Sequence, residues 1–254
     1  MPTNIAVAGK GGTGKTTFCG MLVKQLASRK QGHILAVDAD PNSNLNEVLG
    51  VEAPMTLGDI REGMLDRGSG DALPAGMTKA QYMEFMFGDA LYEDKDYDLL
   101  VMGRTQGSGC YCYVNGVLRA QIDRYSNSYS YIIVDNEAGL EHISRGTLPR
   151  VDILLLISDC SRRGIQAAGR VAQLVGDLNL RPAIMKLIVN RAPGGVVSEG
   201  VLEEIKAQNL DLIGVLPQDE YIYNADSEGL PSSGIPEDAP VKTALKKIVE
   251  ELGL

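Results

Sequence analysis

The feature that most constrains this chain is a short apolar run followed at once by a glycine-rich loop, in residues 4–17, which read N-I-A-V-A-G-K-G-G-T-G-K-T-T. Residues 9–16 match the pattern G-x-x-x-x-G-K-[ST], in which backbone N–H groups turn inward around a β-phosphate. In that pattern Lys15 reaches the β- and γ-phosphate oxygens, and Thr16 offers a hydroxyl to Mg²⁺. A helical pattern follows, and its positive end points at the phosphates. The sequence therefore predicts a nucleoside-triphosphate site formed by Gly9, Lys10, Gly11, Gly12, Thr13, Gly14, Lys15, Thr16 and Thr17.

Strand and helix patterns alternate to the end of the chain and predict an α/β fold. The chain has 254 residues, of which 44% are hydrophobic and 22% charged, so it has ample core for a globular protein. Repeated strand, helix and strand units favour a three-layer P-loop NTPase fold with a mostly parallel sheet covered by helices on both faces. We expect residues 1–254 to form a single domain, with helical segments at 56–64 and 78–91 and strands at 33–37, 97–102, 131–134, 151–158, 184–189 and 212–216.

Charge and hydropathy exclude several classes of partner. The net charge is −9 and the isoelectric point is near 4.8, which argues against a nucleic-acid partner because such binding rests on a basic face. The sequence has no stretch of eighteen apolar residues and no signal-type segment at its start. These features predict a cytoplasmic protein that does not bind a membrane. Its four cysteines are then expected to be thiols or metal ligands.

Three aspartates follow predicted strands. Asp38 and Asp40 lie in D-A-D-P-N-S-N-L after the strand at 33–37, and Asp135 ends the strand at 131–134. The carboxyl ends of parallel strands meet at the edge where ligands bind. We therefore expect these carboxylates near the nucleotide. A purely structural role in a turn remains the alternative for Asp40.

The segment after the strand at 184–189 indicates which nucleotide base the site accepts. A guanine site of the N-K-x-D type needs an aspartate three residues after the asparagine, but Asn190 is followed by Arg191, Ala192 and Pro193. The amide of Asn190 can still meet the edge of an adenine. The segment therefore favours ATP over GTP.

Lys10 directly follows the first glycine, so the loop carries a lysine in addition to Lys15. This loop, G-K-G-G-T-G-K-T, resembles the deviant Walker A loop of a family of ATPases. This family includes the division-site ATPase, the plasmid-partition ATPases, the nitrogenase iron protein and several metal-insertion ATPases. The resemblance implies that Lys10 reaches across a homodimer interface to the nucleotide of the partner subunit. ATP would then join two subunits face to face. The alternative is that Lys10 is an ordinary solvated lysine.

The same resemblance implies roles for the strand-end residues. Asp40 would hold the attacking water, and Asp38 would contact Mg²⁺ through its waters. Asp135 would contact the magnesium shell, and the amide of Gly139 would sense the γ-phosphate. Catalysis would rest on Lys10, Lys15 and Asp40, while Pro217, Gln218 and Asp219 resemble the family's segment beside the base and ribose.

A pair of cysteines follows the strand at 97–102, in G-S-G-C-Y-C-Y. In an extended strand Cys110 and Cys112 would point to opposite faces, but Gly107 and Gly109 allow a curled loop in which both sulfurs face one ion. Two thiolates half-fill the four-coordinate site that Zn²⁺ and other soft divalent metals prefer. In a two-fold dimer, the same loop from each subunit would complete it. A redox dithiol pair and two buried side chains are the alternatives.

Together with D-N-E-A-G-L-E-H-I-S-R-G-T, the cysteine segment resembles the accessory ATPases that mature nickel carbon monoxide dehydrogenase and acetyl-CoA synthase. The resemblance implies an ATP-hydrolysing metallochaperone, a homodimer that binds Ni²⁺ or Zn²⁺ through Cys110 and Cys112 and serves one of those enzymes as client. Two other functions remain open. One is a nucleotide switch that controls a protein partner without metal, and the other is a redox ATPase with a bridging iron–sulfur cluster.

Overall fold

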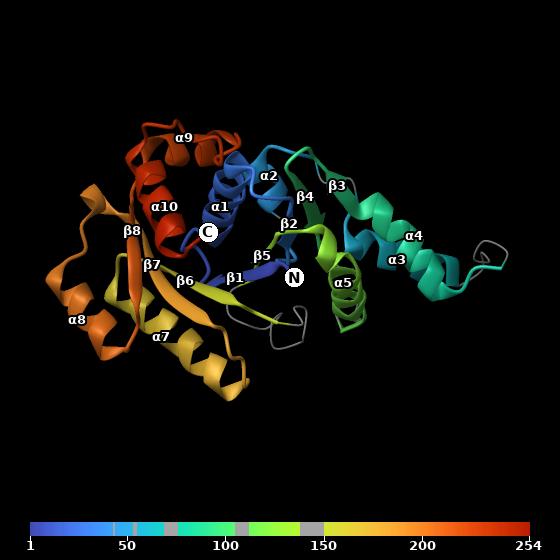
Figure 1. Cartoon of the computed structure of the whole chain (residues 1–254), viewed down its shortest axis with the longest axis horizontal. Helices are drawn as coiled ribbons and strands as arrows, with labels where there is room; N and C mark the ends of the chain where they lie inside the picture. Colours follow the sequence, from blue (N-terminus) through green and yellow to red (C-terminus); the bar gives the residue numbers. More distant parts are fainter. Residues whose placement is uncertain (43, 53–54, 69–75, 105–111, 138–149) are drawn as a thin grey trace.

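One sheet organises the structure, a computed structural model that describes residues 1–42, 44–52, 55–68, 76–104, 112–137 and 150–254 (Figure 1). Its eight strands follow the order β3-β4-β2-β5-β1-β6-β7-β8. All neighbouring strands are parallel except β3 and β4. The strands are β1 (Thr3–Gly9), β2 (Ile34–Asp38), β3 (Leu91–Glu93), β4 (Tyr97–Val101), β5 (Tyr131–Asp135), β6 (Ile153–Asp159), β7 (Ile184–Ala192) and β8 (Leu212–Pro217).

Helices cover both faces of this sheet, as the alternation of patterns predicts. Buried side chains of α1, α2 and α10 belong to one core cluster, and those of α3, α4, α5, α7 and α8 belong to the other. In Figure 1, α1 and α10 lie on one side of the sheet, and α5 and α7 lie on the other. The described helices are α1 (Lys15–Arg29), α2 (Leu45–Leu49), α3 (Leu57–Gly68), α4 (Lys79–Ala90), α5 (Cys112–Tyr125), α7 (Arg162–Asp177), α8 (Glu199–Ala207), α9 (Glu220–Glu228) and α10 (Pro240–Glu251), with short 3₁₀ turns η1 (Ser126–Ser128) and η2 (Pro193–Gly195).

The central strands are buried on both sides because their apolar residues run without interruption. In β1, Ile5 and Val7 face the layer of α1 and α10, whereas Ala6 and Ala8 face the layer of α5 and α7. Successive side chains of a strand point to opposite faces, so a continuous apolar run fills two cores at once. The strand positions expected from the sequence are confirmed, with ends that differ by at most three residues.

One short strand departs from the prediction. The helical pattern at 78–91 is α4, which begins after a capping box between Thr78 and Gln81 and ends at Ala90. Leu91 belongs instead to β3, which pairs antiparallel with β4. A strand of three residues is too short to show an alternating pattern, so the sequence pattern could not predict it.

Sheet order brings the strand ends together. β1 lies between β5 and β6, and the register pairs Asp38 of β2 with Asp135 of β5. On the other side, Gly9 of β1 pairs with Ile157 of β6. The glycine-rich loop therefore lies at the centre of the carboxyl edge, with the carboxylates beside it, as in other open α/β sheets that bind ligands there.

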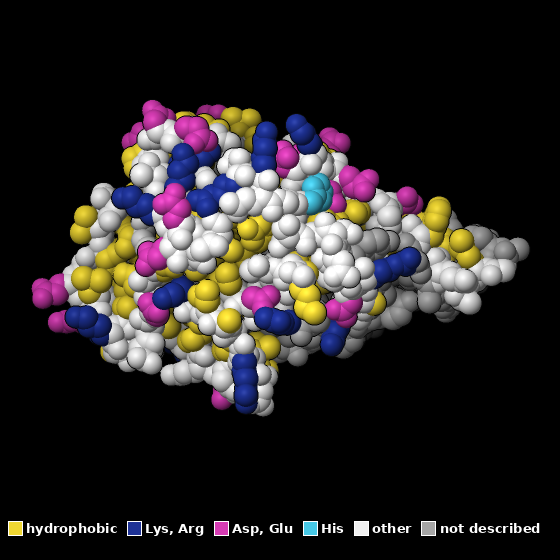
Figure 2. All heavy atoms as spheres, in the orientation of Figure 1, with side chains coloured by type: hydrophobic (Ala, Val, Ile, Leu, Met, Phe, Trp, Pro, Cys, Tyr) yellow, Lys and Arg dark blue, Asp and Glu magenta, His cyan; other side chains and the backbone are white. Residues whose placement is uncertain are grey.

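Charges of both signs are interspersed on the face that Figure 2 shows, with apolar side chains between them. The described residues include surface ion pairs, such as those of Glu237 with Lys242 and Lys246. Such pairs contribute little stability because they remain in water. Within the described residues, no helix is long and apolar enough to cross a membrane.

Candidate functional site

The glycine-rich loop has the geometry of a phosphate cradle. A Cβ at Gly9 would lie 2.2 Å from the carbonyl oxygen of Ile157, so only glycine allows β1 and β6 to approach this closely. Gly12 and Gly14 have φ values of 79° and 85°, in the left-handed region that favours glycine. Gly14 is the N-cap of α1, whose amino end therefore faces the loop.

The two lysines of the loop lie in different surroundings. Lys15 is buried, and its Nζ donates to the carbonyl oxygen of Lys10 at 3.4 Å. The same carbonyl accepts from the hydroxyl of Thr13 at 2.9 Å. The side chain of Lys10 is exposed. Lys15 is thus held inside its own loop, whereas Lys10 lies at the surface, and its reach to a second subunit stays a prediction.

Asp135 is a buried carboxylate that the Thr16 hydroxyl and the Cys19 thiol approach, without a hydrogen bond of normal geometry from any described residue. It is fully buried at the end of β5, and neither of its oxygens has a hydrogen bond of normal geometry within the described part of the chain. Burial raises its pKa to about 6, and the nearby Thr16 hydroxyl and Lys15 ammonium oppose this rise. The thiol of Cys19 is buried against it, and burial raises the pKa of that thiol as well. Orphaned carboxylate oxygens beside a threonine hydroxyl are the hard ligands that Mg²⁺ prefers.

Asp38 is equally buried, but its oxygens are occupied. Oδ1 accepts from the backbone N–H of Asp40 at 3.0 Å, and Oδ2 accepts from the N–H of Leu45 at 2.9 Å. Burial and the neighbouring Asp135 carboxylate raise the pKa of Asp38 to about 7. Asp38 therefore shapes the turn that carries Asp40 and starts α2. A contact between Asp38 and the waters of Mg²⁺ stays a prediction.

Asp40 reaches the phosphate side of the site. A pocket of about 590 Å³ is lined by the glycine-rich loop, by Asp40 and Asn42, and by the segment 229–232 that follows α9. Oδ1 of Asp40 accepts from the backbone N–H and the side-chain amide of Asn42, at 2.8 and 2.9 Å. Lys15, Thr16 and Asp40 thus face one volume, as expected from residues that serve one triphosphate.

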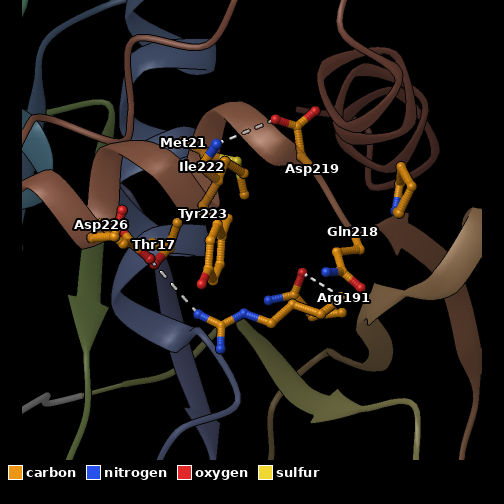
Figure 3. Close-up of a pocket in the computed structure, with 11 residues that line it drawn as sticks. Thr17, Met21, Arg191, Gln218, Asp219, Ile222, Tyr223 and Asp226 are labelled. Carbon is orange, nitrogen blue, oxygen red and sulfur yellow. Dashed lines mark hydrogen bonds and ion pairs between the residues drawn. The ribbon is translucent and has the colours of Figure 1, made fainter.

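A second pocket, of about 480 Å³, lies between β7, β8 and α9 and is lined by the residues expected at the base, Asn190, Pro217, Gln218 and Asp219 (Figure 3). The amide of Asn190 is already engaged there, because its Nδ2 donates to the carbonyl of Thr13 at 2.9 Å. Asp219 caps α9 by accepting from the N–H groups of Tyr221 and Ile222. Pro217 contributes an apolar wall. Asn190 and Asp219 therefore build the pocket, and their contacts with a base or ribose stay predictions.

The pocket residues that the sequence analysis did not single out include Arg191, Tyr223 and Asp226. Tyr223 and Asp226 come from α9 and point toward Arg191 of β7 across the base pocket (Figure 3). Arg191 directly follows Asn190 in the chain, and this proximity was the one available signal. Tyr223 and Asp226 carry no motif, so only the packing of α9 over the site reveals them.

The expected cysteine site is described only in part. Cys110 and Gly139 lie outside the described residues, and α5 begins at Cys112. The backbone of Cys112 is therefore helical, and the expectation that both sulfurs face one ion stays a prediction. Since α5 follows β4 and leads into β5, its first turn lies toward the carboxyl edge of the sheet, as the glycine-rich loop does. Within the described residues, no three His, Cys, Asp or Glu side chains gather into a metal site.

The chain matches known proteins over nearly its whole length. The family profile described as the CobQ/CobB/MinD/ParA nucleotide binding domain matches residues 5–232. An uncharacterized ATP-binding protein of Methanocaldococcus jannaschii is 44% identical over 248 residues, which are 98% of this chain and 97% of the relative.

Two further likenesses bear on function and fold. The carbon monoxide dehydrogenase accessory protein CooC of Rhodospirillum rubrum is 31% identical over 237 residues, which are 89% of this chain and 88% of the relative. The structure of the septum site-determining protein MinD of Pyrococcus horikoshii, complexed with Mg-ADP, superposes with a TM-score of 0.73 at 23% identity and covers 99% of this chain and 96% of that one. The second likeness concerns the fold alone.

Proposed function

Because the chain belongs to the CobQ/CobB/MinD/ParA nucleotide-binding family, we propose that it is an ATPase that carries nickel, or zinc in its place, as a homodimer. The carbon monoxide dehydrogenase accessory protein CooC, at 31% identity, supports carbon monoxide dehydrogenase as the client, and acetyl-CoA synthase is the alternative client that the sequence resemblance implies. The observation that carries the proposal is the placement of Cys112. Cys112 opens α5 toward the sheet edge that also holds the phosphate cradle, so a metal ion held by Cys112 would lie at the same edge as the nucleotide.

The nucleotide site is organised around charge. Lys15 is buried in the cradle and would meet the β- and γ-phosphate oxygens. Thr16 and the unpartnered oxygens of Asp135 would hold Mg²⁺. When bound, Mg²⁺ offsets negative charge on the β- and γ-phosphate oxygens.

Hydrolysis follows from position rather than from covalent chemistry. Asp40 faces the phosphate pocket and would orient a water toward the γ-phosphorus, opposite the bond to the β-phosphate oxygen. The exposed Lys10 would reach the nucleotide of the other subunit, and the partner's Lys10 would return that contact. Turnover by such a site is slow until two subunits meet, because a single subunit lacks the lysine that its partner supplies.

The metal site would form where the two subunits meet. Cys110 and Cys112 from each chain would supply four thiolates to one ion on the two-fold axis. Binding of ATP would favour the closed dimer and gather the sulfurs. Hydrolysis would remove the γ-phosphate contacts and let the sulfurs separate, so that the metal passes to the client.

The proposal is tested by anaerobic titration with Ni²⁺ and Zn²⁺, with oligomeric state followed in the presence and absence of ATP. We expect about one metal ion for each dimer of the wild type. The double variant Cys110→Ser/Cys112→Ser should lose the metal and keep ATP hydrolysis. Cys160→Ser is the matched control, because Cys160 is a partly exposed free thiol remote in sequence from the pair, and it should bind metal normally.

Other outcomes decide against the proposal. One metal ion bound by each monomer would refute the shared site. Undiminished maturation of the client by the double cysteine variant would instead support a nucleotide switch without metal, as in the MinD and ParA branches that the family description names.

A further inference from the structure

Three residues, Thr17, Arg191 and Asp226, line both the base pocket and the phosphate pocket. They therefore form the neck between the two volumes. If a nucleotide places its base in one pocket and its β-phosphate in the cradle, its ribose and α-phosphate must lie in this neck. Asp226 and Arg191 place one negative and one positive charge at that point.

The backbone directs Arg191 to the neck. The pairing of β7 with β8 shifts register between Val189 and Ala192, and Arg191 itself has φ 55°, which is uncommon for a residue other than glycine. Irregularities of this kind re-aim a side chain at the end of a strand. The side chain of Arg191 consequently crosses the floor of the base pocket toward the cradle (Figure 3).

The guanidinium of Arg191 lies on the glycine-rich loop. Its Nη1 donates to the carbonyl of Gly12 at 3.4 Å, and a Cβ at Gly14 would lie 3.5 Å from its Nε. Its Nη2 is 3.8 Å from Oδ2 of Asp226. Both side chains of this ion pair are nearly half exposed, at 48% and 40%.

These contacts are weak and replaceable. An ion pair at 3.8 Å in water, and a long bond to a carbonyl, satisfy little of the guanidinium's five-donor capacity. A phosphate offers two anionic oxygens in the planar geometry that arginine prefers. Asp226 would in turn lose its partner when the phosphate enters.

We propose that Arg191 binds the α-phosphate of the nucleotide, and that Asp226 is the counter-ion which the α-phosphate displaces. This inference rests on the proposed nucleotide site. It adds a cationic side chain that the glycine-rich motif does not contain. Arg191 comes from β7, and its ion-pair partner Asp226 comes from α9.

The test measures affinity for ADP, AMP and adenosine by calorimetry, or by displacement of a fluorescent ADP where binding is weak. Arg191→Ala should weaken ADP and AMP about tenfold and leave adenosine nearly unchanged, because adenosine has no phosphate. Arg191→Lys should recover part of the loss. Asp226→Asn should tighten ADP severalfold, since it removes a competing anion.

Lys186→Ala provides the matched control. Lys186 lies on the same strand and forms a surface ion pair with Asp211, remote from both pockets. Its loss should leave all three affinities unchanged. Rising salt should weaken ADP binding by the wild type more steeply than by Arg191→Ala, because one charge contact is gone.

Several results would overturn the inference. Equal loss of adenosine and ADP in Arg191→Ala would show that the side chain only packs against the cradle. Unchanged ADP affinity would exclude contact with the α-phosphate. If Arg191→Ala fails to fold, Asp226→Asn decides, and unchanged ADP affinity in that variant would have the same meaning. A wild type that binds neither ADP nor ATP would instead refute the nucleotide site itself.

Discussion

Asp38 and Asp135 end neighbouring parallel strands in the same register, yet their carboxylates differ in their partners. Asp38 accepts two backbone N–H groups, from Asp40 and Leu45. Asp135 accepts no hydrogen bond of normal geometry from the described residues, although it is just as buried. Leaving a buried carboxylate unpaired is costly, so such a group persists where something outside the chain completes it. The comparison separates a carboxylate that shapes a turn from one whose oxygens are unpaired among the described residues, which is why we propose Asp135 as the cation ligand.

The largest effect should come from Asp135→Asn. If Asp135 holds Mg²⁺, the variant should lose ATP hydrolysis by about a thousandfold, because a neutral amide offsets little of the metal's charge. Its stability should stay the same or rise, since an unpaired buried charge disappears. Steady-state ATPase rates and urea unfolding measure the two quantities. If the ATPase rate of the variant stayed within about tenfold of the wild-type rate, Asp135 would not belong to the metal site.

Asp38→Ala should have the opposite signature. It leaves the N–H groups of Asp40 and Leu45 without acceptors, and we expect a loss of about 2 kcal/mol in the free energy of unfolding. Asp38→Asn keeps one acceptor oxygen and should lose less. Urea unfolding at fixed pH measures both. A fully stable Asp38→Ala would mean that the turn does not depend on this carboxylate.

The pH dependence of stability should report both groups. The pKa of Asp38 is raised to about 7 and that of Asp135 to about 6, so the folded apoprotein binds more protons than the unfolded chain between their ordinary values and these. Stability should therefore fall as pH rises from about 4 to about 7, by at most about 1.4 kcal/mol per pH unit for each carboxyl. Chemical unfolding across that range tests the slope. Each asparagine variant should flatten it, and a flat wild-type profile would contradict the assigned shifts.

Cys19→Ser should give the smallest effect. The thiol of Cys19 is buried against Asp135, and a serine hydroxyl is a better hydrogen-bond donor than a thiol. The change should lower the pKa of Asp135 by less than about one unit and move its part of the stability slope to lower pH. The part due to Asp38 should not move. Equal displacement of both parts would place Cys19 beside both carboxylates.

The sequence predicted the local parts of the site well and the shared parts less well. The cradle is contiguous, so Gly9, Lys15 and Thr16 could be read directly. The turn after Asp38 is also local, but its use of the carboxylate depends on where two N–H groups point. Arg191 and Asp226 meet only because α9 folds over the end of β7, and no periodicity records such a contact.

The sequence by itself determined the phosphate cradle, the parallel α/β architecture and the family, because these depend on short motifs and on apolar runs of strand length. Tertiary structure decided which strand ends became neighbours, which buried carboxylate had donors, and which side chains formed the neck of the nucleotide site. The physical reason is that a residue's role depends on whether neighbours distant in sequence satisfy its charge and its hydrogen bonds. That is settled by the order of the strands and by the helices packed over their ends.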